Sequence, residues 1–218
     1  MTVPVGIATD LWTRLAAAAR VRSTDAEPAH DFFHVERVVE NAITISRAEH
    51  ANEAVAATAA LLHEIFNLPK SHPGSSRAGD ICAEHAQALL IAEGASPELV
   101  SPVCDAIRDH AFSKGVVPEA LESRVVQDAD RLDALGAIGL ARMWATCADM
   151  KRPFYAPDDP FCTARVPDDK LWGLDHVFKK LLVVPGRLSL PTSREIARDR
   201  VRFIEAFVEQ LRREISPR

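Results

Sequence analysis

The sequence predicts an all-α fold. Long stretches rich in alanine, leucine, glutamate and arginine alternate with short segments rich in proline, glycine and serine. No stretch shows the alternation of β-branched residues that is typical of strands. With 218 residues, 47% of them hydrophobic, the chain can build one compact helical domain. The expected helices cover residues 7–22, 31–49, 51–66, 76–94, 97–112, 122–149, 168–184 and 192–215.

Two of these helices have recognisable starting residues. Asp31 precedes an apolar run with a helical period, so its carboxylate can cap the first turn. Ser96 is followed by Pro97, and proline is favoured in a first helical turn because its missing N–H has no partner to lose there. Ser101 and Pro102 repeat that signal, so this helix could instead begin at Pro102.

Proline marks two irregular segments. Pro69 and Pro73 remove backbone donors and clash with a preceding turn, so residues 66–76 are expected to form a loop. Residues 153–167 hold four prolines and three aromatic side chains. They are expected to form either an ordered connector packed on the helices or a lid over a pocket.

Charge and cysteine usage limit the class of protein. The net charge of −5 gives no bulk positive field, so polymeric nucleic acid is not an expected partner. Residues 1–19 carry Asp10 and Arg14 and lack the pattern of a signal peptide or a membrane anchor. We therefore expect a cytoplasmic protein with no membrane partner; no oligomeric state is predicted. The cysteines, none in a C-x-x-C pair, are expected to be small core residues: Cys82, Cys104, Cys147 and Cys162.

Several polar side chains are expected to point into the core. His63 lies four residues after Ala59 and eight after Val55, on the apolar side of its helix. His110 occupies the inner stripe of its own helix in the same way. A polar ring that faces a core needs a hydrogen-bond partner or a metal ion. One such histidine is usually a hydrogen-bonded core residue, whereas several together with carboxylates favour a metal site.

Asp130 adds a carboxylate to this set. It lies one helical turn from Val126 and from Ala134 in a segment that is apolar nearly all round, so it should be buried. A buried carboxylate needs a cation. That cation could be Arg131, in an internal ion-pair network, or a metal ion held together with histidines, which is the better explanation once His34 is included.

The order of these residues resembles the HD superfamily of metal-dependent phosphohydrolases, whose signature is H…HD…D. The resemblance covers most of the chain, extends into residues 157–161 and 174–176, and is to a bacterial single-domain branch. It implies an all-α helical bundle with a core at about residues 25–150, on which C-terminal helices at about 168–215 pack. The matching motifs are His30-Asp31-x-x-His34-x-x-Arg37-Val38, Ala60-Leu61-Leu62-His63-Glu64 and Val125-Val126-Gln127-Asp128-Ala129-Asp130-Arg131-Leu132-Asp133-Ala134-Leu135-Gly136.

The resemblance implies four metal ligands: His34, His63, Glu64 and Asp130. Glu64 departs from the family, which has aspartate there, and is longer by one methylene. Asp128 and Asp130 point about 200° apart on a helix, so only one of them can face the ion. The family pattern A-D-x-L selects Asp130 as the ligand. Asp128 remains a candidate to contact the ligands rather than the ion.

The implied activity is hydrolysis of a small phosphorylated metabolite, and by the same resemblance a nucleotide. The expected cofactor is one divalent metal ion (Mn, Mg, Co, Ni, Zn or Fe). His110 could position the substrate or act as a general acid, or could be structural. Arg37 could pair with a ligand carboxylate, and His72 could gate the pocket or be exposed. Cations that could hold phosphate oxygens, or be solvated surface charges, are Lys70, Arg77 and Lys114.

Two other functions are compatible with the sequence. A two-metal oxygenase or phosphodiesterase of the same superfamily would use further histidines, and His85 and His110 lie in the relevant interval. However, that interval lacks the adjacent His-His pair expected of the phosphodiesterases. Alternatively, the exchange at Glu64 could have left a catalytically weakened module that binds nucleotides for regulation.

Overall fold

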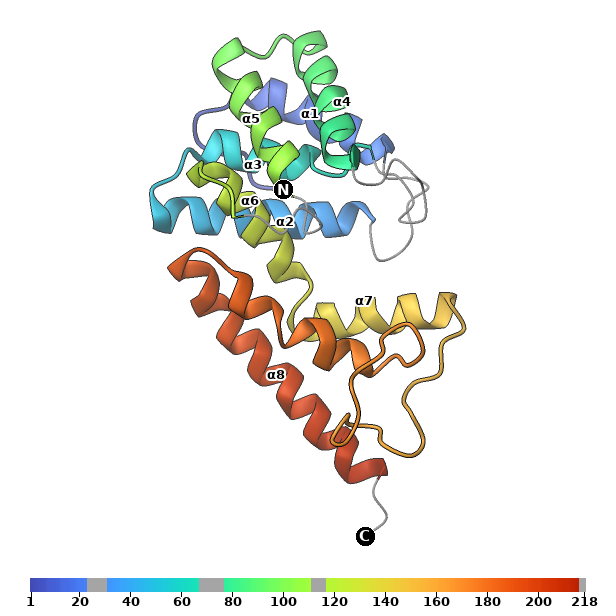
Figure 1. Cartoon of the computed structure of the whole chain (residues 1–218). Coiled ribbons are helices and arrows are strands. Elements are labelled where there is room, and N and C mark those ends of the chain that lie inside the picture. The colour runs from blue at the N-terminus through green and yellow to red at the C-terminus, as the bar shows by residue number, and fades with distance from the viewer. Residues whose placement is uncertain (23–30, 67–76, 111–116, 216–218) are drawn as a thin grey trace. The chain divides into compact units, whose positions relative to one another are not determined.

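The computed structural model describes residues 1–22, 31–66, 77–110 and 117–215, and among these every regular element is a helix (Figure 1). The all-α prediction is therefore confirmed. No helix within these ranges is long and apolar enough to cross a membrane. The chain divides into two compact units, residues 1–130 and 131–218. The expectation that they form one domain stays a prediction.

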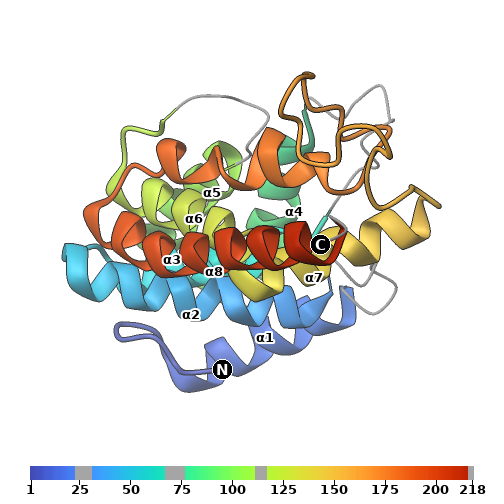
Figure 2. The same cartoon turned by 90° about the horizontal axis from the view of Figure 1, so that it is seen from below.

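Unit 1 is built around a short central helix. Its helices are α1 (Thr9–Arg22), α2 (Phe32–Glu49), α3 (Glu53–Leu62), α4 (Ala78–Ala92), α5 (Pro97–Asp109) and the larger part of α6 (Leu121–Asp133). All ten residues of α3 are buried, and this helix packs against α1, α2 and α5. Figures 1 and 2 both show α3 between α2 and α5. Residues that lie next to α3 are therefore at the centre of the unit.

The predicted starts of two helices in unit 1 are confirmed. Asp31 is the N-cap of α2, and its carboxylate accepts a hydrogen bond from the backbone N–H of His34 at 3.0 Å. The other helix, α5, begins at Pro97 directly after Ser96, so Pro102 lies inside it. A helix was also expected to continue to residue 66, but α3 ends at Leu62 and the chain turns at His63.

Unit 2 contains the end of α6, then α7 (Gly136–Asp149), a π-helical turn (Val177–Leu181), a 3-10 turn (Val184–Arg187) and α8 (Pro191–Ile215). The prediction of one helix over residues 122–149 is wrong, because the chain breaks between α6 and α7. Leu135 is extended there, and Gly136 adopts a φ of +70° that residues with a side chain rarely adopt. A Cβ at Gly136 would also lie 3.2 Å from the side chain of Arg200 on α8.

The prediction of a regular helix over residues 168–184 is also wrong. Side chains in this segment bond to nearby backbone groups, an alternative to the helical pattern. The carboxylate of Asp175 accepts from the N–H of Asp168 at 2.6 Å, and the carboxylate of Asp168 accepts from the N–H of Lys170 at 3.0 Å. Within this segment, helical conformation is confined to residues 175–181 and to the 3-10 turn that begins at Val184.

Residues 153–167 form an irregular connector that packs on the helices of unit 2. The ring of Phe154 meets that of Trp144 on α7 edge-on, with centroids 5.1 Å apart. Phe161 is buried, and the guanidinium of Arg212 on α8 lies 4.0 Å from its ring centroid. These contacts favour the connector over the lid.

Candidate metal centre

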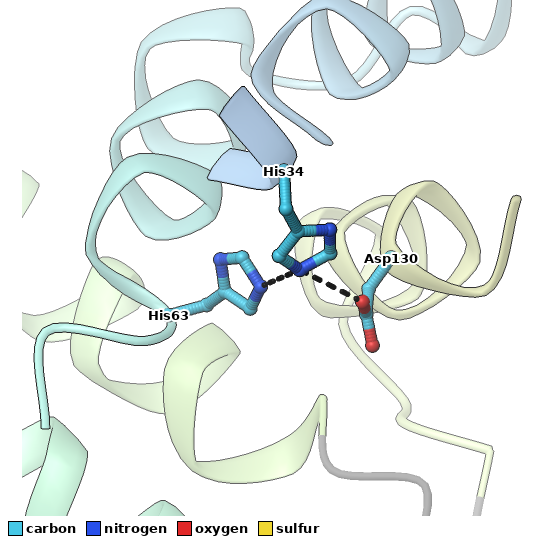
Figure 3. Close-up of side chains that lie close together, drawn as sticks. All are labelled: His34, His63 and Asp130. Carbon is cyan, nitrogen blue, oxygen red and sulfur yellow. Dashed lines mark hydrogen bonds and ion pairs between the residues drawn. The ribbon is translucent and has the colours of Figure 1, made fainter. Parts of the chain in front are cut away.

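Three of the predicted ligands converge in unit 1: His34 from α2, His63 from the turn after α3, and Asp130 from α6. One ligand atom from each lies within 4.8 Å of the other two. The Nε2 atoms of His34 and His63 are 3.3 Å apart, and His34 Nε2 is 3.6 Å from Asp130 Oδ1. Figure 3 shows His34 between the other two side chains, with Nε2 facing both of them.

The backbone at the end of α3 fixes the orientation of His63. This residue is the C-cap of the helix, where the last backbone carbonyls have no helical N–H partner. The ring Nδ1 lies 2.6 Å from the carbonyl oxygen of Ala60 and can donate its proton there. In that tautomer, Nε2 carries the lone pair and lies 3.3 Å from His34 Nε2.

His110 repeats this arrangement at the end of α5. It is the C-cap of that helix, and its Nδ1 lies 2.5 Å from the carbonyl oxygen of Ile107. Its ring is half-buried and meets the ring of His63 edge-on, with centroids 5.3 Å apart. The structure therefore places His110 beside the cluster, with Nε2 as its remaining ring nitrogen.

Glu64 lies next to the three clustered residues. Its Oε2 is 3.8 Å from His34 Nε2, and its side chain is 16% exposed. The four predicted ligands therefore lie in one region, and Glu64 stands slightly farther out than His63 or Asp130. Their assignment as metal ligands stays a prediction.

Burial and charge set the protonation states of the cluster. Burial lowers the pKa of His63 to about 4, although the charges of Glu64 and Asp130 partly oppose this shift. At neutral pH the ring is therefore uncharged and its lone pair is available. For Asp130, burial raises the pKa, but the interactions with the nearby imidazoles of His63, His34 and His110 outweigh burial and lower it overall, so the carboxylate is ionised at neutral pH.

The donor set fits a divalent first-row metal ion. It offers imidazole nitrogens and carboxylate oxygens, the ligand types that Zn, Mn, Fe, Co and Ni accept. Two nitrogens that bind one tetrahedral ion at about 2.0–2.1 Å lie about 3.3 Å from each other. The observed separation between the Nε2 atoms of His34 and His63 is 3.3 Å. These two rings therefore need little rearrangement to share an ion.

The remaining predicted residues lie in several places. Arg77 is exposed, directly before α4, and Arg37 is half-buried on α2 one turn after His34. Asp128 is fully buried on α6 and does not belong to the cluster. Three residues lie outside the described ranges: Lys70, His72 and Lys114.

Two side chains named in the alternative interpretations are engaged elsewhere. His85 is exposed on α4, and its ring stacks on that of Phe66 with centroids 4.5 Å apart. Arg131 donates from Nη1 to the carbonyl oxygen of Arg187 at 2.6 Å. The cluster itself consists of two histidines and a carboxylate.

Comparison with known proteins agrees with this geometry. Residues 32–135, which include all four predicted ligands, match the model of the HD domain family. The uncharacterized protein YpgQ of Bacillus subtilis (strain 168) is 31% identical over 196 residues, which are 88% of this chain and 87% of YpgQ.

Solved structures extend the similarity over nearly the whole chain. Bacillus subtilis YpgQ in complex with ADP superposes with a TM-score of 0.71 at 29% identity, over 92% of this chain and 97% of that one. An HD-superfamily hydrolase from Bacillus thuringiensis superposes with a TM-score of 0.72 at 29% identity, over 94% and 96%.

Proposed function

The chain belongs to the HD domain family, and we propose that it is a metal-dependent phosphohydrolase that acts on a nucleotide. The observation that carries this proposal is the convergence of His34 Nε2, His63 Nε2 and the Asp130 carboxylate at one point. Two imidazole nitrogens and an ionised carboxylate grouped within 4.8 Å of one another favour a cation between them.

We assign His34, His63, Glu64 and Asp130 as the residues that would hold one divalent ion. Such an ion supplies Lewis acidity, which polarises a phosphoryl oxygen and acidifies water. The protein contributes rigid placement: His63 is fixed through Nδ1 by the carbonyl of Ala60, and its burial keeps the ring neutral.

His110 is the candidate for proton transfer. In hydrolysis, water forms a new bond to phosphorus, the bond to the leaving oxygen breaks, the water loses a proton and the leaving oxygen gains one. The Nδ1 of His110 is engaged by the carbonyl of Ile107, and its ring lies beside that of His63. Its Nε2 can therefore accept or return one of these protons. Lys70 and Arg77 are proposed to hold the other phosphate oxygens.

The nucleotide is supported by similarity. YpgQ, at 31% identity over most of both chains, has been solved in complex with ADP. A nucleoside phosphate also presents the oxygens and the scissile phosphorus that the proposed site requires.

The test is a hydrolysis screen of nucleoside mono-, di- and triphosphates with added Mn²⁺, Mg²⁺, Co²⁺ or Ni²⁺, in which both phosphate and pyrophosphate are measured. We expect turnover with at least one metal, and metal binding at least about 100-fold weaker in His63→Ala. The control is His50→Asn, which changes an exposed histidine in the left-handed conformation that asparagine tolerates.

Two outcomes would contradict the proposal. Absence of turnover with every metal, together with unchanged metal binding in His63→Ala, would overturn both the metal site and the activity. Metal and nucleotide binding without turnover would instead identify a regulatory module.

A further inference from the structure

The turn after α3 carries two of the four proposed ligands and begins where helical hydrogen bonding stops. The N–H of Ile65 donates to the carbonyl oxygen of Leu62 at 3.1 Å, and the Ala60 carbonyl receives the ring proton of His63. The carbonyl of His63 lies in this turn, beyond the end of the helical ladder. Its partner comes from another helix.

That partner is the thiol of Cys82 on α4. Its sulfur lies 3.2 Å from the carbonyl oxygen of His63 and 3.5 Å from that of Leu62. A cysteine thiol is a weak donor, so this one buried sulfur holds the carbonyls of the last residue of α3 and the first residue of the turn.

Close packing of α4 brings the sulfur to this position. Cys82 is 2% exposed, on a buried face of α4 that continues with Ala86 and Leu90 at intervals of four residues. One turn before it, Gly79 packs against α5, where an added Cβ would lie 3.0 Å from the carbonyl oxygen of Arg108. The helix therefore approaches its neighbours with small side chains.

We propose that Cys82 is a positioning residue of the metal centre, an inference that rests on the function proposed above. The ring of His63 is held through Nδ1 by the carbonyl of Ala60, and its backbone is held through its carbonyl by the Cys82 thiol. Loss of the sulfur releases the backbone of His63 and Glu64 together. Groups that orient metal ligands typically contribute 10-fold to 100-fold to metal affinity.

The test compares Cys82→Ala with Cys104→Ala in the full-length protein. Cys104 is a buried cysteine on α5 in the same unit, so it controls for loss of a buried sulfur. Co²⁺ affinity and the visible absorption spectrum of the Co²⁺ protein are measured, with thermal unfolding of the metal-free forms alongside. We expect Cys82→Ala to weaken Co²⁺ binding about 10-fold to 100-fold and to change the spectrum, and Cys104→Ala to do neither.

A second pair of variants separates hydrogen bonding from packing. Cys82→Ser keeps a small donor and acceptor and should restore most of the Co²⁺ affinity, whereas Cys82→Val fills the space without polar contacts and should not. This pair carries the same test if Cys82→Ala does not fold. The inference is overturned if Cys82→Ala and Cys82→Val keep the wild-type affinity and spectrum, or if Cys104→Ala weakens binding as much. If the wild-type protein binds no Co²⁺, Mn²⁺ or Ni²⁺, the proposed function fails first, and this inference fails with it.

Discussion

Asp130 in unit 1 and Asp175 in unit 2 are both carboxylates held by tertiary structure, but they face different groups. Asp175 is fully buried and accepts two hydrogen bonds from the guanidinium of Arg165, at 2.5 and 2.6 Å. It also accepts from the N–H of Asp168 at 2.6 Å. Asp130 is 30% exposed and faces His34 at 3.6 Å.

The difference lies in where the positive charge comes from. The Asp175 cluster carries its own cation, because a guanidinium is charged at every ordinary pH. The Asp130 cluster includes His63, which burial keeps neutral at pH 7. A carboxylate paired with arginine forms an ion pair that stabilises the fold. A carboxylate grouped with the neutral imidazole of His63 retains the capacity to bind a cation from solution.

The largest effect on stability is expected in unit 2. Asp175→Asn leaves Arg165 without its carboxylate and should lower the free energy of unfolding by about 3 kcal/mol, the lower end for loss of a buried partner because Arg165 is 26% exposed. Urea unfolding at pH 7 measures the change. Asp158→Asn, an exposed residue of the same segment, should cost less than about 0.5 kcal/mol. If the two variants were equally stable, the Arg165–Asp175 ion pair would not stabilise the fold.

The two clusters should also lose stability in different pH ranges. Unfolded His63 takes up a proton near pH 6.5 but the folded residue only near pH 4, so its contribution is complete above pH 6.5 and is lost as the pH falls toward 4. The full change is about 3 kcal/mol. Burial raises the pKa of Asp175, but Arg165 and the N–H of Asp168 outweigh burial and lower it overall. The Asp175 contribution is therefore lost only below the ordinary value of 3.8.

Urea unfolding of the metal-free protein between pH 7 and 4 measures the His63 contribution. His63→Asn should remove most of the pH dependence in this range, because asparagine does not titrate. His50→Asn should keep it, since His50 is exposed. Equal slopes for wild type and His63→Asn would show that the buried ring is not the group that titrates.

Local signals in the sequence predicted much of unit 1 and less of unit 2. Asp31 and Pro97 mark helix starts by mechanisms that act within one turn, and both starts are confirmed. The break at Gly136 was missed because the surrounding residues have a helical apolar pattern, and one glycine inside such a pattern is usually tolerated. The segment 168–184 depends on bonds from Asp168 and Asp175 that residue propensities do not encode.

For the metal centre, the sequence indicates the candidate ligands but not the residue that holds them in position. Inward-facing histidines and the family resemblance indicated His34, His63 and Asp130, which the structure brings together. For Cys82 the sequence predicts only a small core residue. Its contact with the His63 carbonyl joins α4 to the turn after α3, and a single cysteine in an alanine-rich helix has no periodic signal that would indicate it.

The smallest effect is expected at Glu64, and it tests whether the unit 1 cluster is a working centre. Glu64→Asp shortens a side chain whose Oε2 lies 3.8 Å from His34 Nε2, so the carboxylate should still reach the site at some cost in geometry. We expect turnover with Mn²⁺ to change by less than about tenfold, which is about 1.4 kcal/mol. Glu64→Gln keeps the length but removes the charge, and should lose more. If Glu64→Asp instead created turnover in a protein that had none, the wild-type cluster would be a binding site that has lost its catalytic function.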